Sequence, residues 1–417
     1  MRRIYFLVLA VLVSASVSPL IAQSSQPITI TVDATDAPRK MLHADMAIPV
    51  HPGDLTLLYA QWIPGEHGPT GPIDNLAGLT IQADGKTLPW VRDSVNMFAF
   101  HVHVPDGVTL LKVHDDFLAT AGAAGFSAGA STSANLAMVS WNEVILWPAN
   151  RPAHETMVQP NVILPDGWKF GTALTSIGHE GNTTHFAAVS VNDLVDSPLL
   201  SGRYFKEYDL APEITPKHYL DLVADGPEDL AVPPQMLAGF NNLVRETGAL
   251  YTARHYNSYH FLMTLSDQVA HFGLEHHQSN DDRVPEKTFL SPNLDVLEAG
   301  LLPHEFTHSW NGKYRRPGGL ISPDFQTPMK GNLLWVYEGL TEYLGDVLTA
   351  RSCGESFSKA SIRWRVRSRC NGGMSSICCK RLRSLCWRCG GRRLKPGSLR
   401  RARCCCCGDM FWCCCNH

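Results

Sequence analysis

Cysteine is absent from the first 352 residues, because all 13 cysteines of this 417-residue chain lie at or after Cys353. A body of that size without cysteine cannot be a disulfide-stabilised scaffold, so packing must hold it together. Long apolar runs are also missing. The longest, at residues 4–13, is about half of what a bilayer span needs. The composition therefore predicts no stable membrane span once the N-terminal segment is removed.

Excess charge of one sign is also missing from the chain as a whole, whose net charge is only −3. It divides sharply along the chain, however. Residues 353–417 carry 15 Lys and Arg against Glu355 and Asp409, a net of +13, which leaves −16 for residues 1–352. An acidic body argues against nucleic acid as a partner.

The N-terminus has the layout of a secretory signal peptide. Arg2 and Arg3 precede the apolar run, and small residues follow up to Ala22. We expect cleavage near Gln23 and export to the periplasm or the cell exterior. The remaining length is enough for two or three domains.

Residues 23–205 read as an all-β, sandwich-like domain. Period-two alternation marks residues 28–32, 98–104 and 108–113, with Gly, Pro and Asp between the runs. His101 and His103 lie on one face of such a strand and could form a metal pair. Without a third ligand in view, ordinary strand histidines are favoured.

A Gly-x-Ser-x-Gly match at residues 125–129 raises a different mechanism, that of an exported serine hydrolase using Ser127. That motif needs a β-strand before the serine and a helix after it. The preceding segment is rich in Gly and Ala and the following one in Ser and Thr, so a flexible loop is favoured.

The residues best suited to metal binding and acid-base catalysis lie in Pro303-His304-Glu305-Phe306-Thr307-His308. In an α-helix, positions four apart share one face, so His304 and His308 could bind one metal ion. Glu305 lies about 100° around the helix, where a general base acting on a water at the metal belongs. Pro303 fits a helix whose first turn it occupies, since its missing N–H costs nothing there.

A third ligand is expected from a second helix. Leu333, Leu334, Tyr337, Leu340, Leu344, Val347 and Leu348 repeat with a period near 3.6, which predicts a helix with a broad buried face. Glu338 lies within this pattern, and a buried carboxylate there needs a partner or a metal. Glu342 shares its face and could accept the free N–H of a ligand histidine, although a solvated charge is equally compatible.

These residues resemble the glycyl aminopeptidase family of zinc metallopeptidases, within the thermolysin-like gluzincins. The resemblance rests on the order and spacing of five motifs: His304-Glu305-x-x-His308-x-Trp310-Asn311, Trp335-x-x-Glu338-Gly339-x-Thr341-x-Tyr343, Gly273-Leu274-Glu275-His276, Trp62-x-Pro64-Gly65 and Val195-Asp196-Ser197-Pro198. They cover residues 28–352.

The resemblance implies an α+β architecture, in which the β domain precedes a thermolysin-like catalytic domain at residues 206–352. It implies Zn²⁺ held by His304, His308 and Glu338, and cleavage of small N-terminal residues such as Gly or Ala from peptides with a free N-terminus. Gly273 and Glu275 look like the exopeptidase strand of related aminopeptidases, whose glutamate receives the substrate ammonium. A surface acid is the alternative for Glu275.

The resemblance ends past about Arg351, where an irregular, Cys- and Arg-rich sequence of residues 353–417 begins. Cys386-x-x-Cys389 could suggest a metal knuckle, but neither that nor nucleic-acid binding suits an exported acidic body. Charge, cysteine content and pattern change together, so we interpret the segment as a disordered product of a frameshift. The ligands could then persist in a truncated peptidase, or in a non-catalytic β-domain binding protein whose peptidase module is degenerate.

Overall fold

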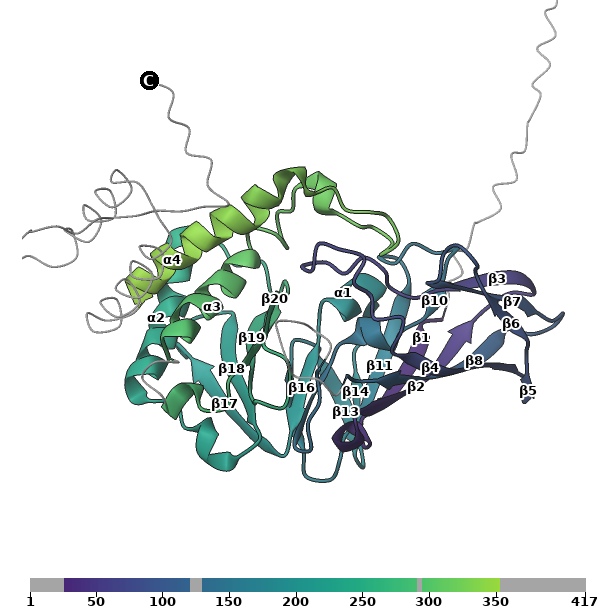
Figure 1. Cartoon of the computed structure of the whole chain (residues 1–417), viewed down its shortest axis with the longest axis horizontal. Coiled ribbons are helices and arrows are strands. Elements are labelled where there is room, and N and C mark those ends of the chain that lie inside the picture. Colours follow the sequence, from purple (N-terminus) through teal and green to yellow (C-terminus); the bar gives the residue numbers. More distant parts are fainter. Residues whose placement is uncertain (1–25, 121–129, 291–294, 353–417) are drawn as a thin grey trace, which may run out of the picture.

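The computed structural model of the protein describes residues 26–120, 130–290 and 295–352 (Figure 1). Three sequence predictions fall outside these residues: the signal peptide at residues 1–22, the serine motif around Ser127, and the tail at residues 353–417. The described part contains two strand-rich halves, with its long helices in the C-terminal half.

Two sheets build most of the N-terminal half. A nine-stranded sheet has the order β13-β14-β11-β1-β2-β8-β4-β5 with β15 beside β11, and a four-stranded sheet has the order β10-β3-β7-β6. Their bounds are β1 Ile28–Asp33, β2 Met41–Pro49, β3 Gly53–Leu58, β4 Leu76–Ala83, β5 Lys86–Thr87, β6 Trp90–Arg92, β7 Ala99–Val104, β8 Leu110–Leu118, β10 Trp147–Pro148, β11 Met157–Ile163, β13 Ser176–Glu180, β14 Thr183–Phe186 and β15 Val189–Ser190.

Alternation explains how these sheets pack. Ile28, Ile30 and Val32 of β1 are buried in the same core cluster as Phe100 and Val102 of β7, while the intervening residues of each strand point away from it. The period of two in a strand puts alternate side chains on one face, so the apolar faces of the two sheets meet. The prediction of a strand-rich, sandwich-like N-terminal domain is confirmed.

A small third sheet connects the halves. It has the order β12-β16-β9, with bounds β9 Leu136–Val139, β12 Lys169–Thr172 and β16 Leu199–Gly202. Leu136 and Leu200 from this sheet share a buried apolar cluster with Val223 and Leu262 of the C-terminal half. Removing this surface from water is favourable in proportion to its area, which fixes the two halves against one another.

The C-terminal half is built on a five-stranded sheet of order β17-β18-β19-β21-β20. The strands are β17 Tyr204–Leu210, β18 Lys217–Ala224, β19 Ser258–Leu265, β20 Phe272–Glu275 and β21 Ser279–Val284. The sheet therefore begins at Tyr204, close to the predicted start of the catalytic domain at residue 206.

The helices are α1 Val191–Val195 in the N-terminal half, then α2 Pro234–Tyr251, α3 Asp295–His308 and α4 Leu340–Ser352, with one π-helix, η7 Trp335–Gly339. The 3-10 turns are η1 Ala37–Arg39, η2 Trp141–Glu143, η3 Pro227–Leu230, η4 Thr288–Leu290, η5 Gly318–Leu320 and η6 Gly331–Leu333.

Helix α3 packs its apolar residues onto this sheet. Leu302 and Phe306 are fully buried in one core cluster with Tyr259 and Phe261 of β19. The expectation that Pro303 lies in the first turn is wrong, because α3 begins at Asp295 and Pro303 lies in its interior. Packing of Leu302 and Phe306 on either side of Pro303 offsets the backbone hydrogen bond that the proline removes.

The expected broad buried face after residue 333 is only partly present. Tyr337 and Leu348 are buried, but Leu333 and Leu340 are exposed. Helix α4 packs against α2 and α3, and the side chain of Tyr343 on this helix is 57% exposed. The segment also starts as a 3-10 turn and a π-helix rather than as a regular α-helix. The apolar period therefore located the helix correctly but overestimated its burial.

The α+β fold is confirmed. No helix in the described ranges combines the length and the apolar character that a membrane span requires.

Candidate active site

Two histidines of α3 face one another. The rings of His304 and His308 lie with centroids 4.8 Å apart, and their Nε2 atoms are separated by 3.1 Å. The four-residue spacing within the helix produces this arrangement locally.

Each ring is oriented by a partner at its other nitrogen. Nδ1 of His308 donates to the carbonyl of Asn311 at 3.0 Å, and Nδ1 of His304 lies 3.2 Å from Oε2 of Glu342. With a proton on each Nδ1, both Nε2 lone pairs are free and point into the same space. Glu342 therefore occupies the position expected for a carboxylate that orients a ligand histidine.

Glu338 completes a set of three donors. It comes from the π-helix η7, and its Oε2 lies 3.4 Å from Nε2 of His304 and 3.4 Å from Nε2 of His308. Ligand atoms about 2 Å from one ion at tetrahedral angles lie about 3.3 Å apart, so the three separations fit one metal ion. His304, His308 and Glu338 form one of two groups of side chains in the described residues that could hold a metal.

The pKa values of the histidines and of Glu338 depend strongly on one another. Burial lowers the pKa of His304, but hydrogen bonds with Glu338 and Glu342 outweigh burial and raise it to about 11. Burial raises the pKa of Glu338, yet its bonds to His304, His308 and His67 hold that pKa far below its usual range. The carboxylates thus create a potential that favours a cation between the histidines.

Glu305 lies beside the donors and is buried. Burial raises the pKa of its carboxyl to about 7, and the charges of Glu275 and Glu338 act in the same direction against the opposing effect of the histidines. Gly273 makes room for Glu305, because a Cβ atom on that glycine would lie 2.7 Å from Oε1 of Glu305. A carboxyl that titrates near neutrality suits proton transfer.

The second possible metal group, Glu275, Glu305 and His308, shares His308 with the first. It offers one nitrogen and two carboxylates, and Glu275 already accepts a hydrogen bond from the hydroxyl of Tyr337. The first group keeps Glu305 free for acid-base chemistry, and we therefore take it as the metal centre.

Glu275 ends β20, the last strand of the five-stranded sheet. Burial raises the pKa of this carboxyl, but His308, Lys313 and the Tyr337 hydroxyl together hold it below the usual value. Gly65 packs directly against it, since a Cβ atom there would lie 2.8 Å from Oε2 of Glu275, and this glycine has φ +96°. The result is an ionised carboxylate beside the metal donors.

A histidine of the N-terminal half also belongs to the site, although no motif of the sequence predicted it. His67 follows the Trp62-x-Pro64-Gly65 motif, and its Nε2 lies 2.7 Å from Oε1 of Glu338. The His67 ring also packs edge-on against Tyr337, with centroids 4.8 Å apart. Only its position near that motif could have singled it out.

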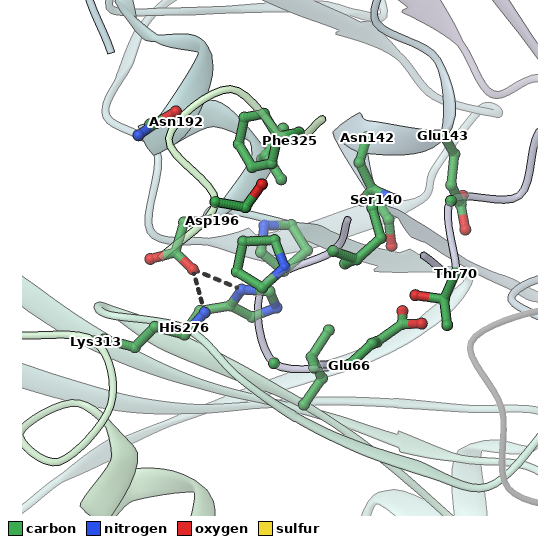
Figure 2. Close-up of a pocket in the computed structure, with 18 of the residues that line it drawn as sticks. Glu66, Thr70, Ser140, Asn142, Glu143, Asn192, Asp196, His276, Lys313 and Phe325 are labelled. Carbon is green, nitrogen blue, oxygen red and sulfur yellow. Dashed lines mark hydrogen bonds and ion pairs between the residues drawn. The ribbon is translucent and has the colours of Figure 1, made fainter. Parts of the chain in front are cut away.

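The motif Val195-Asp196-Ser197-Pro198 lies beside the site because Asp196 bonds to residues of the C-terminal half. Asp196 accepts hydrogen bonds from Nζ of Lys313 at 2.9 Å and from the backbone N–H of His277 at 3.0 Å, and lies 3.2 Å from Nδ1 of His276 (Figure 2). Burial opposes ionisation of this carboxyl, but these partners hold its pKa far below the usual value. Asp196 thereby ties α1 to the C-terminal half.

The paired strand histidines lie away from this centre. Both histidines lie on the exposed face of β7, where His101 contacts Asp93 and Thr56, and His103 contacts Asp54. Neither belongs to a metal-binding group in the described residues.

Models of known protein families match parts of both halves of the chain. A family model described as the peptidase M61 N-terminal domain matches residues 29–203, and one described as M61 glycyl aminopeptidase matches residues 298–369. The second match continues past Arg351, so the expected end of the resemblance there is too early. No curated protein matches the chain.

One solved structure shares the fold. An aminopeptidase N family protein from Idiomarina loihiensis matches with TM-score 0.64 at 20% identity, covering 78% of this chain and 55% of that one. The chain thus spans about half the length of that protein. Two structures of a two-domain M1 zinc metallopeptidase, bound to L-tryptophan and to L-arginine, match at 13% and 12% identity with TM-scores 0.46 and 0.47, covering 82% and 83% of this chain and 74% of theirs.

Proposed function

Because the chain belongs to the M61 glycyl aminopeptidase family, we propose that it is a zinc aminopeptidase that removes N-terminal residues from peptides. One observation carries the proposal: three metal donors with tetrahedral spacing lie beside an ionised, buried Glu275. The donors account for hydrolysis, and the carboxylate accounts for recognition of a free N-terminus.

His304, His308 and Glu338 would hold the zinc ion. When bound, zinc is a Lewis acid that lowers the pKa of a coordinated water and polarises a carbonyl. Glu305 takes the proton of the attacking water and passes it to the leaving amine, for which a pKa near 7 is suitable. Glu342 orients His304, and Asn311 orients His308 through its carbonyl.

Glu275 binds the substrate ammonium and Gly273 gives the peptide access to the edge of β20. This strand is the last of its sheet, so an extended peptide can pair with it. Fixing the ammonium at Glu275 sets which peptide bond reaches the metal, and the enzyme therefore removes single residues. Small first residues, Gly and Ala, are expected substrates from the family description.

Export remains part of the proposal, and it is supported by the charged and apolar layout of residues 1–22. The N-terminus of the protein purified from the culture medium or periplasm tests it. We expect the mature chain to begin near Gln23, and recovery of an intact Met1 would overturn this part.

The enzymatic proposal is tested with purified protein and glycine 4-nitroanilide. We expect hydrolysis that a chelator abolishes and stoichiometric zinc restores, and no hydrolysis of the N-acetylated substrate. Labelling of Ser127 by a fluorophosphonate with activity unaffected by chelation would instead indicate a serine hydrolase. Stoichiometric zinc binding without hydrolysis of any aminoacyl substrate would indicate a non-catalytic binding protein.

A further inference from the structure

Tyr337 contacts both Glu275 and the metal donors, and its side chain is only 1% exposed. Its hydroxyl donates a hydrogen bond to Oε1 of Glu275. Its ring packs against the imidazole of His308, with ring centroids 4.9 Å apart. In the sequence it directly precedes Glu338. One side chain therefore joins the carboxylate that we assign to the substrate ammonium to the metal centre.

The π-helix η7 directs two consecutive side chains into the site. In an α-helix, neighbouring side chains diverge by about 100° around the axis. A π-helix closes its hydrogen bonds over five residues, so each turn is wider and neighbours diverge less. Tyr337 can therefore reach Glu275 while Glu338 lies 3.4 Å from Nε2 of His308.

Asn311 holds the backbone of this helix in place. Its Nδ2 donates to the carbonyl of Val336 at 2.9 Å and to that of Tyr337 at 3.3 Å. The hydroxyl of Thr341 also donates to the carbonyl of Tyr337, at 2.7 Å. Since the carbonyl of Asn311 accepts the hydrogen bond from His308, one residue fixes Tyr337 relative to a metal donor.

The ring of Tyr337 is also tightly enclosed. Gly312 has φ +140°, and a Cβ atom on it would lie 2.7 Å from Cζ of Tyr337 and 3.0 Å from the hydroxyl oxygen. His67 packs edge-on against the same ring, and His308 lies against it at a tilt. This packing holds the hydroxyl in one position, and the hydroxyl in turn holds Oε1 of Glu275.

This contact decides how the hydroxyl can act on a substrate. A tyrosine has one O–H proton to donate, and Glu275 accepts it. The hydroxyl therefore acts through Glu275 and does not donate to the scissile carbonyl. The position of Glu275 matters because a displacement of about 1 Å between reacting groups can cost on the order of 10²-fold in rate.

We propose that Tyr337 is a positioning residue, whose hydroxyl fixes the distance between the ammonium site at Glu275 and the metal donors. This inference rests on the proposed aminopeptidase function, and it identifies what sets the bond to be cleaved. With Glu275 held at one distance, a bound N-terminus brings its own peptide bond, and no later one, to the metal.

A pair of metal-binding ligands tests this role without turnover. Zinc-loaded protein is titrated in a calorimeter with glycine hydroxamate and with acetohydroxamate, which has the same metal-binding group but no ammonium. We expect the wild type to prefer glycine hydroxamate by about 10²-fold, because an ion pair forms in a buried site. Tyr337→Phe keeps the ring and removes only the hydroxyl. It should reduce the preference by about tenfold, since a hydrogen bond to a charged group is lost, and should leave the affinity for acetohydroxamate unchanged.

A matched control shows whether loss of any tyrosine hydroxyl has this effect. Tyr219 of β18 lies in the same half, and its ring stacks on His260. Tyr219→Phe keeps that stack and should leave both hydroxamate affinities at the wild-type values. A preference that Tyr337→Phe kept in full would overturn the inference and leave the proposed function standing. Equal wild-type affinities for the two hydroxamates would remove the ammonium site itself, and with it both.

A double-mutant cycle distinguishes positioning of Glu275 from a general structural effect. We measure kcat/KM for glycine 4-nitroanilide in Tyr337→Phe, in Glu275→Gln and in the double variant. Tyr337→Phe alone should lose about tenfold, but the double variant should lie within about threefold of Glu275→Gln, because residues that act through one another are not additive. Additive losses would overturn the inference. A tenfold fall of the hydroxamate preference in Tyr337→Phe, without hydrolysis of any aminoacyl substrate by the wild type, would overturn the proposed function and leave the positioning role.

Discussion

His67 Nε2 lies 2.7 Å from Oε1 of Glu338, while Oε2 of the same carboxylate lies 3.4 Å from Nε2 of both His304 and His308. One glutamate thus joins the N-terminal half to the histidine donors of the C-terminal half. The side chain of Glu338 is still 36% exposed, so packing alone does not fix its position. The hydrogen bond from His67 supplies a restraint from 271 residues away.

Replacing His67 with alanine is therefore expected to weaken zinc binding by about 10- to 100-fold, the usual effect of losing the partner of a metal ligand. Competition with a chromophoric chelator measures the affinity. His67→Gln keeps a donor for Oε1 and should recover part of the loss. His103→Ala removes an exposed histidine of the same half and serves as the control. Unchanged zinc affinity in His67→Ala would contradict the role of this contact.

Glu305→Gln tests the acid-base residue. The amide keeps the shape of the side chain but cannot accept a proton, so we expect kcat to fall by about 10²- to 10⁴-fold. Zinc content measured by atomic absorption should stay near one per chain, because Glu305 is not among the three donors. If kcat remained within tenfold of the wild-type value, the assignment of the base would be wrong.

Glu275→Gln tests recognition of the N-terminus. The amide can still accept the hydrogen bond from Tyr337, but it loses the charge that faces the substrate ammonium. We expect kcat/KM for glycine 4-nitroanilide to fall by about 10²-fold or more, since an unpaired charge is then left in a buried site. Zinc affinity is measured in the same variant and should stay unchanged if the metal centre is intact. An equal loss of zinc would instead indicate that Glu275 acts as a ligand.

Burial raises the pKa of Glu143, which predicts how stability changes with pH. A carboxyl whose pKa is 4.5 in the unfolded chain and about 8 in the fold contributes stability below pH 4.5, and this contribution is lost as pH rises through about 8. Each pKa unit corresponds to about 1.4 kcal/mol. Wild-type protein should therefore lose several kcal/mol relative to Glu143→Gln between pH 5 and pH 9.

Urea unfolding at pH 5, 7 and 9 measures that difference. Other titrating groups are common to both proteins, so subtracting the two curves isolates Glu143. Glu155→Gln, whose side chain is exposed, should track the wild type at every pH. Parallel curves for Glu143→Gln and wild type would show that Glu143 titrates in the fold as it does in the unfolded chain.

Much of the fold could be predicted from local pattern. The alternation in β1 and β7 and the helical period of α2 depend on which residues face one core, and that information is written in short windows. Burial of the last helix could not be predicted in the same way. Exposure of Leu333 and Leu340 depends on which elements lie over them, and a periodic sequence does not contain that information.

By itself, the sequence determined that His304 and His308 face one another, because four helical residues complete about one turn whatever surrounds them. It also placed Glu305 beside them, indicated Glu338 from its place within an apolar helical pattern, and indicated Glu342 from its position one turn further on. Only the tertiary structure decided that His67 and Tyr337 come to this centre. Their proximity depends on how the two halves pack, through a buried apolar interface that no local periodicity encodes.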